Sequence, residues 1–312
     1  MNQKLALVFP GQGSQTVGML ADLYAEFPLV RDTFAEASAA LGYDLWALVA
    51  NGPEADLNET HRTQPALLTA SVAVWRLWQQ QGGATPAYLA GHSLGEYSAL
   101  VCAGVLTLSD AVKLVEKRGQ YMQSAVPAGT GAMSAIIGLD DALIAKACEE
   151  AAQGEVVSPV NYNSPGQVVI AGHKAAVERA NELCKAAGAK RALPLPVSVP
   201  SHCALMRPAA EQLAKDLQTL PFHAPVISVV NNVDVAVAAD AAAIQDALIR
   251  QLFSPVRWTE TIEYLAAQGV TEVIELGAGK VLSGLIKRIN KELVTTSVND
   301  VASLQAALAA KD

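Results

Sequence analysis

Residues 87–105 read AYLAGHSLGEYSALVCAGV, and this stretch decides the fold class of the chain. The short apolar run Ala87–Ala90 predicts a buried strand, and Glu96–Val105 is typical of a helix. Between them stands Gly91-His92-Ser93-Leu94-Gly95, in which the glycines leave room for a sharp backbone turn. A strand that passes through such a turn directly into a helix is typical of the α/β class.

Strands and helices also alternate on either side of this stretch. Lys4–Phe9 is an apolar run closed by Pro-Gly, which predicts another buried strand. Helical spacing of apolar residues predicts a helix over Pro65–Gln81, and Ser109 is the expected N-cap of a helix that reaches Ser124. Further strands are expected at Val226–Asn231 and Glu272–Leu276. The alternation predicts a parallel sheet with helices on both faces.

The pattern changes after Val126. From there the predicted elements follow the order βαββαβ, which is that of a ferredoxin-like unit. Their ranges are Ala132–Leu139, Asp140–Ala152, Val156–Val160, Gln167–Ala171, Ala175–Gly188 and Arg191–Val199. We therefore expect a large α/β-hydrolase-like domain with a parallel sheet, formed by residues 1–127 and 198–312, and a small ferredoxin-like domain inserted at 128–197.

Composition and charge argue against several classes of protein. Of the 312 residues, 51% are hydrophobic and 17% are charged, which is typical of a compact chain rather than a disordered one. The formal net charge is -8, and an acidic protein attracts nucleic acid poorly. No apolar run approaches the ~20 residues of a membrane span, and the run before Pro10 is shorter than that of a signal peptide. We expect a cytoplasmic protein that binds neither nucleic acid nor a membrane.

The four cysteines, Cys102, Cys148, Cys184 and Cys203, are widely scattered and form no Cys-x-x-Cys pair. This spacing predicts neither a disulfide framework nor a metal site. Reduced thiols in a reducing compartment are the simplest interpretation.

Ser93 stands in the pattern Gly-x-Ser-x-Gly between a predicted strand and a predicted helix, which is the context of a nucleophile elbow. Such a turn lifts the serine hydroxyl clear of the sheet, at a helix N-terminus. Backbone N–H groups there, including that of Leu94, can bind a developing oxyanion. The alternative is an ordinary glycine-rich turn with a capping serine.

A nucleophilic serine needs a base, and the chain has five histidines. His92 adjoins Ser93, but neighbouring side chains diverge in a tight turn. Three others, His61, His173 and His223, lie in polar segments typical of surface histidines. His202 follows an apolar strand, and sites in α/β sheets gather at the carboxyl ends of strands. His202 could therefore meet Ser93 there; the alternative is a histidine that caps a helix.

Arg118 lies on the apolar stripe of its predicted helix, three positions after Val115 and four before Met122. An arginine that faces a core needs a partner, because an unpaired buried charge is costly. The partner could be an Asp or Glu of the chain, or the side chain could snorkel to solvent. The guanidinium could equally bind a substrate carboxylate at two points. The helical pattern alone favours neither interpretation.

An ordered series of short motifs runs along nearly the whole chain. They are Phe9–Gln15, Thr63–Leu67, Gly91–Glu96, Arg118–Met122, Asn161–Gln167, Val199–His202, Gln251-Leu252, Pro255–Trp258 and Glu275–Gly277. In these motifs the chain resembles the malonyl-CoA:acyl-carrier-protein transacylases, the malonyl-loading enzymes of bacterial fatty acid synthesis. That family also has a small ferredoxin-like insert.

The resemblance implies a catalytic set. Ser93 would be the acylated nucleophile and His202 its base. Gln251 would orient His202 through its backbone carbonyl, in place of the acidic member of a triad. The backbone N–H groups of Gln12 and Leu94 would bind the oxyanion.

The resemblance also implies a substrate-binding set and a reaction. Arg118 would hold the malonyl carboxylate, with Met122, Asn163 and Gln64 close to the substrate. Ser93 would take the malonyl group from malonyl-CoA and pass it to the phosphopantetheine thiol of acyl-carrier protein, in two half-reactions that supply fatty acid elongation. No metal and no tightly bound cofactor is expected, and the protein is expected to act as a monomer whose partners are acyl-carrier protein and a coenzyme A thioester.

Two further features bear on substrate choice and on docking. In related modular synthase domains a bulky residue often precedes the histidine where malonyl is chosen. Here that position is the small Ser201, so it does not secure the exclusion of methylmalonyl groups. Lys287, Arg288 and Lys291 are expected to form a docking patch for the acidic carrier protein; a solvated helix face is the alternative.

Three rival functions stay open on the sequence. A hydrolase could use the same elbow, although its chain order is Ser, acid, His, and no acidic residue between Ser93 and His202 stands out. The chain could also be a non-catalytic acyl-binding protein, but such a protein does not need Ser93 and His202 together. A transacylase of a polyketide pathway or of malonate decarboxylase would share the chemistry.

Overall fold

The strand β1 (Asn2–Phe9) occupies the middle of a parallel sheet because its second half is apolar on both faces. The computed structural model describes residues 1–197 and 199–310. Its larger sheet has five parallel strands in the order β7-β2-β1-β8-β9. The other strands are β2 (Pro86–Gly91), β7 (Ser228–Val230), β8 (Glu272–Leu276) and β9 (Val294–Val298). The expected parallel sheet is confirmed.

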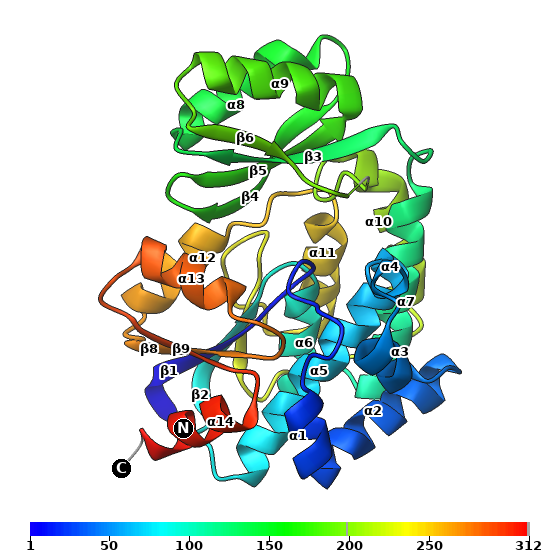
Figure 1. The fold of residues 1–312 in the computed structure, drawn as a ribbon, viewed down its shortest axis with the longest axis vertical. Coiled ribbons are helices and arrows are strands. Elements are labelled where there is room, and N and C mark those ends of the chain that lie inside the picture. Colours follow the sequence, from blue (N-terminus) through cyan, green and yellow to red (C-terminus); the bar gives the residue numbers. More distant parts are fainter. Residues whose placement is uncertain (198, 311–312) are drawn as a thin grey trace.

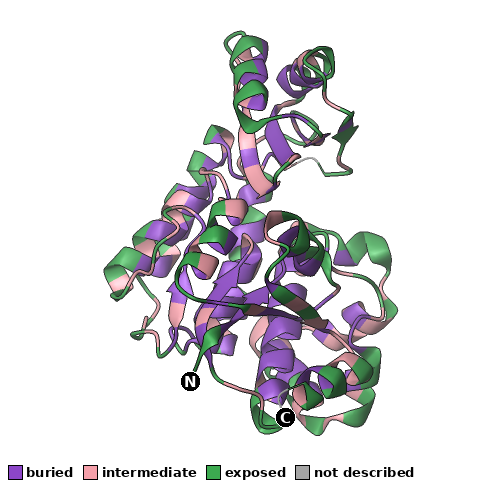
Figure 2. Cartoon of the chain, turned by 90° about the vertical axis from the view of Figure 1, so that its left-hand side faces the viewer, coloured by how far each residue is buried: buried purple, intermediate pink, exposed green. Residues whose placement is uncertain are grey.

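Side chains of β1 alternate between two apolar clusters, one on each face of the sheet. Leu5, Leu7 and Phe9 join the larger cluster, whereas Ala6 and Val8 join the smaller one. The larger cluster receives apolar residues from α2 (Pro28–Leu41), α5 (Thr60–Gln80), α6 (Leu94–Cys102), α7 (Leu108–Ser124), α10 (Arg207–Leu217) and α11 (Ala241–Gln251). The smaller receives them from α12 (Trp258–Ala267) and α13 (Val281–Ile289). Figure 2 shows this buried interior in purple.

The smaller sheet lies above the larger one in Figure 1, with two helices on its outer side. Its elements are β3 (Gly131–Ile137), α8 (Asp141–Ala152), β4 (Val157–Ser164), β5 (Gln167–His173), α9 (Lys174–Ala186) and β6 (Arg191–Pro194). The strands are antiparallel in the order β4-β5-β3-β6. The predicted βαββαβ unit is therefore present beside the parallel sheet, and the fold class is confirmed.

Backbone hydrogen bonds tie this small unit to the large one. Val256 lies beside β4: its N–H donates to Val160 O over 2.8 Å, and Tyr162 N–H donates to Val256 O over 3.0 Å. The Thr259 hydroxyl adds a bond to Tyr162 O. Strand β4 is thereby held over the carboxyl ends of the parallel strands.

The remaining helices are α1 (Ala21–Glu26), α3 (Leu45–Asn51), α4 (Glu54–Leu57), the short 3₁₀ helix at Ala204–Met206, and α14 (Val301–Ala309). None of the described helices combines the length and apolar character that crossing a membrane requires. Within 1–197 and 199–310, no three His, Cys, Asp or Glu side chains gather as a metal site. All four cysteines are free and buried.

The structure corrects several predicted boundaries. The N-cap of α7 is Thr107 and not Ser109, because the Thr107 hydroxyl accepts the N–H of Asp110 over 3.1 Å. Strand β6 covers only Arg191–Pro194; Leu195 N–H still donates to Met133 O over 2.9 Å, and Pro196 after it has no N–H to continue the ladder. Strand β7 covers only Ser228–Val230. The expected domain boundary at Ser198 lies outside the described residues, so the division of the chain stays a prediction.

Candidate active site

The turn that carries Ser93 is as sharp as its glycines predict. Strand β2 ends at Gly91 and α6 begins at Leu94, so the chain reverses within two residues. Ser93 has φ 52° and ψ −109°, a conformation that costs a non-glycine residue about 1–3 kcal/mol. A Cβ on Gly91 would overlap the backbone of Gly95. The surrounding structure therefore holds the serine in a strained conformation at the end of a central strand.

His202 meets Ser93 at this turn. The Ser93 hydroxyl lies 2.7 Å from His202 Nε2, and His202 Nδ1 lies 2.7 Å from the backbone carbonyl of Gln251. That carbonyl can only accept, so it fixes a proton on Nδ1 and leaves Nε2 as the acceptor for the hydroxyl. Burial, together with the positive charge of Arg118, lowers the pKa of His202 to about 3. The neutral imidazole required of a base is thus the resting form.

Arg118 is fully buried beside this pair, and it forms no salt bridge with a described acidic residue, although the buried Glu96 carboxyl acts on it electrostatically. Its guanidinium donates to Gln64 Oε1 over 2.8 Å and to Gln251 Oε1 over 2.9 Å, and it lies 3.2 Å from the Ser93 hydroxyl. Its Nε has no hydrogen-bond partner among the described residues. Burial lowers the pKa of Arg118. Among the described residues Arg118 thus has no direct salt bridge, and its burial excludes a snorkelling side chain, so the cation can still bind an anion.

Gln64 and Met122 surround the guanidinium. Gln64 Nε2 donates to the Thr60 hydroxyl over 2.9 Å and contacts the Met122 sulfur at 3.7 Å. Thr60 in turn donates to Gln12 Oε1 over 3.0 Å. A chain of polar contacts therefore joins Arg118 to Gln12, on the loop after β1.

Asn163 reaches the site from the small sheet. Its Oδ1 lies 2.7 Å from Nε2 of His92, the residue before the nucleophile. His92 packs against Trp258, with ring centroids 5.5 Å apart, and burial lowers its pKa. The hydrogen bond of the His92 side chain thus links the elbow to β4.

Ser93 and His202 line a pocket of about 460 Å³ between the two sheets. Gln12 and His92 line it from the large unit, and Met133 and Asn161 from the small one. One wall is apolar, formed by Leu195, Pro196, Val197 and Val199 just before Ser201 and His202. The volume fits a ligand of moderate size with an extended arm.

Two buried residues of this site were not predicted. Asn232 bonds the elbow backbone, and Glu96 accepts the Asn232 backbone N–H over 2.6 Å. Burial raises the pKa of Glu96 to about 7. A signal for Asn232 existed, because the Asn231-Asn232 pair closes a predicted strand next to the elbow strand, at the edge where sites gather.

The arrangement is suited to acyl transfer through a serine ester. A hydroxyl, a neutral imidazole and an orienting carbonyl form a line of hydrogen bonds, as nucleophilic catalysis requires. The Ser93 N–H is occupied by Asn232 Oδ1, whereas the Leu94 N–H has no partner among the described residues. The Leu94 N–H is therefore free to bind an oxyanion. A carbonyl, not a carboxylate, orients the histidine, which differs from the triad of the rival hydrolases.

Comparisons with known proteins agree with this chemistry. The model of the acyl transferase domain family matches residues 6–307. The chain is 69% identical over 305 residues to the malonyl CoA-acyl carrier protein transacylase of Salmonella typhimurium, covering 98% of this chain and 99% of that protein. The Bacillus subtilis protein of the same name is 47% identical over 306 residues, covering 98% and 96%.

Solved structures agree as well. An acyl carrier protein S-malonyltransferase from Vibrio cholerae superposes with a TM-score of 0.96 at 71% identity, covering 97% of this chain and 99% of that one. A malonyl-transacylase in complex with its type II PKS acyl-carrier protein superposes with a TM-score of 0.98 at 64% identity, covering 99% and 100%. The chain therefore belongs to the acyl transferase domain family and is an acyltransferase, as the motifs of its sequence predicted.

Proposed function

We propose that this acyltransferase moves the malonyl group from malonyl-CoA to the phosphopantetheine thiol of acyl-carrier protein, through a malonyl ester on Ser93, and so supplies fatty acid elongation. The observation that carries the proposal is the buried Arg118 guanidinium, which forms no salt bridge with any described residue and lies 3.2 Å from the Ser93 hydroxyl. An acyl group esterified to Ser93 and ending in a carboxylate would supply the missing anion. The relatives named as malonyl transacylases support this choice.

In the first half-reaction the Ser93 oxygen attacks the thioester carbonyl while its proton passes to His202 Nε2. The backbone N–H groups of Leu94 and Gln12 stabilise the negative charge on the carbonyl oxygen. The carbon–sulfur bond then breaks, and the thiolate of coenzyme A leaves with the proton from His202. In the second half-reaction the carrier-protein thiol gives its proton to His202 and attacks the ester carbonyl. The ester carbon–oxygen bond then breaks, and the Ser93 oxygen takes the proton from His202 and leaves as the hydroxyl.

Arg118, Gln64 and Gln251 form the part of the site that binds the acyl group and selects it. Both amide oxygens, Gln64 Oε1 and Gln251 Oε1, fix the guanidinium plane, so that its remaining donors are oriented before substrate binds. Met122 and Asn163 complete this part from α7 and β4. The apolar wall of the pocket next to Val199 is suited to the aliphatic parts of a pantetheine arm.

The transfer is tested by initial rates at several concentrations of malonyl-CoA and holo acyl-carrier protein. A covalent intermediate released by the second substrate predicts parallel double-reciprocal lines. Steady release of free malonate without the carrier protein would point instead to a hydrolase. Binding of malonyl-CoA with no turnover at all would favour an acyl-binding protein.

A second candidate differs only in the acceptor. The similar structure that holds a type II PKS acyl-carrier protein supports a candidate function in which this chain also loads such a carrier. Comparing kcat/KM for the two holo carrier proteins distinguishes the candidates: the fatty acid assignment predicts the higher value for the fatty acid carrier.

The pH dependence of acylation follows from the environment of His202. Because burial and Arg118 hold the pKa of His202 at about 3, the imidazole stays neutral at pH values well below those at which a histidine is ordinarily protonated. We expect the acylation rate to change less than about 3-fold from pH 7 to pH 5, whereas a histidine of pKa ~6.5 would lose about 30-fold. The check is a stopped-flow pH profile with malonyl-CoA; a fall centred between pH 6 and 7 would contradict the assignment.

The docking patch is the next prediction. Lys287 and Arg288, in the last turn of α13, and Lys291 are exposed, and α13 packs against β4 at the side of the pocket. Reversing the three charges is expected to raise KM for the carrier protein about 5- to 50-fold and to leave KM for malonyl-CoA unchanged, because exposed charges mainly steer association. Lys146→Glu, on α8 at the outer side of the small sheet, is the matched control. An unchanged carrier-protein KM in the triple variant would rule the patch out.

Four expectations complete the proposal and rest on the sequence. The catalytic domain comprises 1–127 and 198–312, and 128–197 is the inserted domain. The protein acts as a monomer in the cytoplasm and needs no tightly bound cofactor. Light scattering of the purified protein, and its activity after exhaustive dialysis against chelator, test the oligomeric state and the need for a cofactor.

A further inference from the structure

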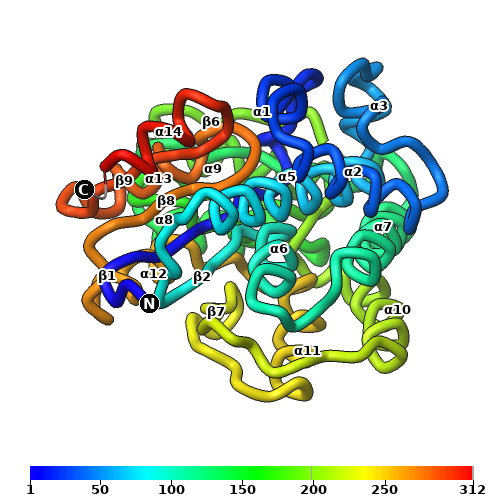
Figure 3. The backbone as a smooth tube through the Cα atoms, turned by 90° about the horizontal axis from the view of Figure 1, so that it is seen from below, coloured from blue at the N-terminus to red at the C-terminus, as the bar shows by residue number. Residues whose placement is uncertain are grey.

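Asn232 lies directly behind the nucleophile elbow. It follows β7, the edge strand that pairs with the elbow strand β2 (Figure 3), and its side chain is fully buried. A buried amide has several donors and acceptors to satisfy. All described partners of its side chain belong to the elbow or, in the case of Gln251, contact the elbow.

The Asn232 side chain bridges the two ends of the turn. Its Nδ2 donates to Gly91 O over 2.7 Å, and its Oδ1 accepts the Ser93 N–H over 2.8 Å. Strand β2 ends at Gly91 and α6 starts only at Leu94, so these two backbone groups fall between the sheet ladder and the helix. Buried backbone groups need partners, and here a single side chain supplies both.

Asn232 itself is fixed from two sides. Its backbone N–H donates to Glu96 Oε1 over 2.6 Å, and its Oδ1 also accepts from Gln251 Nε2 over 3.3 Å. The same Gln251 amide donates to Ser93 O over 3.1 Å. Both backbone groups of the nucleophile are therefore held, the N–H by Asn232 and the carbonyl by Gln251.

These contacts join the three parts of the site. Gln251 accepts His202 Nδ1–H with its backbone oxygen and Arg118 with its side-chain oxygen. The strained backbone of Ser93, the base and the buried cation thus share one hydrogen-bonded network, in which Asn232 is the link to the turn.

We infer that Asn232 is a positioning residue for acyl transfer: by spanning Gly91 O and Ser93 N–H, it holds the Ser93 hydroxyl against His202. This rests on the proposed function. Without the bridge, the residue with φ 52° is free to relax, and the hydroxyl moves away from Nε2. A displacement of about 1 Å in such a pair can lower a rate about 100-fold.

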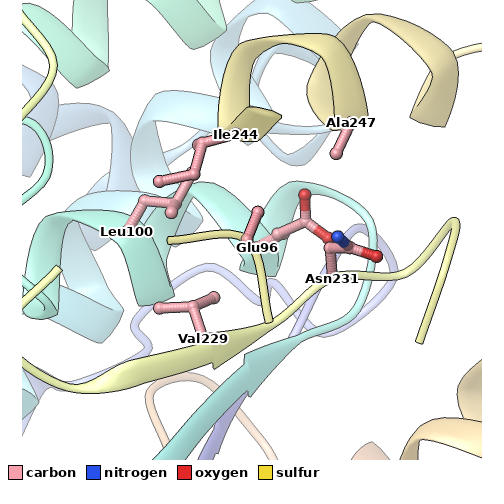
Figure 4. Close-up of a pocket in the computed structure, with 7 residues that line it drawn as sticks. Glu96, Leu100, Val229, Asn231, Ile244 and Ala247 are labelled. Carbon is pink, nitrogen blue, oxygen red and sulfur yellow. The ribbon is translucent and has the colours of Figure 1, made fainter. Parts of the chain in front are cut away.

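The cavity in Figure 4 supplies the matched control. It is lined by Glu96 and Asn231 together with Leu100, Val229, Ile244 and other apolar residues. Asn231 precedes Asn232 and is also buried, but its Oδ1 accepts only the N–H of Asp234, in the local turn. Asn231→Ala therefore removes a buried asparagine of the same segment without touching the elbow.

The experiment measures the single-turnover rate of Ser93 acylation by malonyl-CoA and the KM for malonyl-CoA. For Asn232→Ala we expect the rate to fall about 30- to 300-fold, with KM within about 3-fold of the wild type. For Asn231→Ala we expect a rate within about 3-fold of the wild type. The melting temperature of each variant is measured in parallel. Equal rate losses in both variants, or a loss confined to KM, would overturn the inference.

Asn232→Asp gives a readout that a loss of stability alone would not produce. A protonated aspartic acid can still donate to Gly91 O and accept from Ser93 N–H, whereas the carboxylate can only accept. Burial beside Glu96 raises the pKa of such an aspartate. The ionisable groups around the elbow are Glu96, Tyr97, Arg118, His202, His92 and Asp234. All are shared with the wild type, so the ratio of variant rate to wild-type rate reports the new carboxyl group together with its coupling to Glu96.

We expect that ratio to lie within about 5-fold of unity at pH 5.5 and to fall at least about 10-fold by pH 8.5. A ratio that is low and independent of pH would overturn the inference, and this test remains if the alanine variant fails to fold. Labelling of Ser93 by a fluorophosphonate provides the same comparison without malonyl-CoA. If the wild type were labelled but not malonylated, the proposed function would fail, while the labelling rates of the variants would still decide the role of Asn232.

Discussion

His202→Asn is expected to lower the rate of Ser93 acylation about 10³- to 10⁶-fold, the largest loss of any substitution proposed here apart from that of the nucleophile. The hydroxyl donates to His202 Nε2 at 2.7 Å, and no other described side chain offers it a basic nitrogen. Without the base, the Ser93 hydroxyl must attack the thioester with no group to accept its proton. Stopped-flow acylation with malonyl-CoA, or thiol release from it, measures the rate.

Asparagine is the replacement of choice because His202 has φ 65°. This left-handed conformation is tolerated by asparagine better than by alanine, so the backbone of the site is preserved while the base is lost. An unchanged melting temperature, together with retained binding of malonyl-CoA, is the control. If the folded variant were acylated within about 10-fold of the wild-type rate, His202 could not be the base.

Arg118→Ala is expected to remove the preference for malonyl over acetyl groups. The buried guanidinium forms no salt bridge with any described residue and lies 3.2 Å from the Ser93 hydroxyl, so a substrate carboxylate can supply the direct counter-charge. Losing a buried, hydrogen-bonded charge pair costs about 3–5 kcal/mol, which corresponds to a fall of about 10²- to 10⁴-fold in kcat/KM for malonyl-CoA. For acetyl-CoA, which has no carboxylate, we expect a change of less than about 10-fold.

The two kcat/KM values are measured on the same enzyme preparation, and Arg118→Lys serves as the matched control. Lysine keeps the charge but not the planar fork, so it is expected to recover part of the malonyl preference. An alanine variant that still preferred malonyl-CoA by the wild-type ratio would show that Arg118 does not read the carboxylate. Equal losses for both substrates would indicate instead that the site had collapsed around Gln64 and Gln251, which lose their partner.

The sequence predicts the elbow well because its determinants are local. Glycine at positions 91 and 95, between an apolar strand and a helix, leaves one steric solution, and the strained φ of Ser93 follows from it. The helix face on which Arg118 lies also follows from neighbouring residues alone, and the residue is indeed buried. The partner of the arginine was not predictable from that pattern, since Gln64 and Gln251 lie 54 and 133 positions away.

The contacts of Asn232 and Glu96 with the elbow were not predicted either, because they also join residues far apart in the sequence. Asn232 bonds Ser93 across 139 positions and Glu96 across 136, and no periodic pattern reports such a contact. The end of the predicted strand at Asn231 places Asn232 at the edge of the sheet, but it does not show which backbone groups the side chain bonds. The wrong N-cap is a different error: Thr107 and Ser109 are both good caps, and only the folded backbone shows that Thr107 reaches the Asp110 N–H.

The central claim is that Ser93 carries the acyl group between the two thiols. The most direct test is the intact mass of the protein after brief mixing with malonyl-CoA, compared with Ser93→Ala and followed by addition of holo acyl-carrier protein. The account predicts a gain of one malonyl group in the wild type, its absence in the variant, and its removal by the carrier protein. A malonyl adduct that persisted in Ser93→Ala, or one that the carrier-protein thiol could not remove, would contradict it.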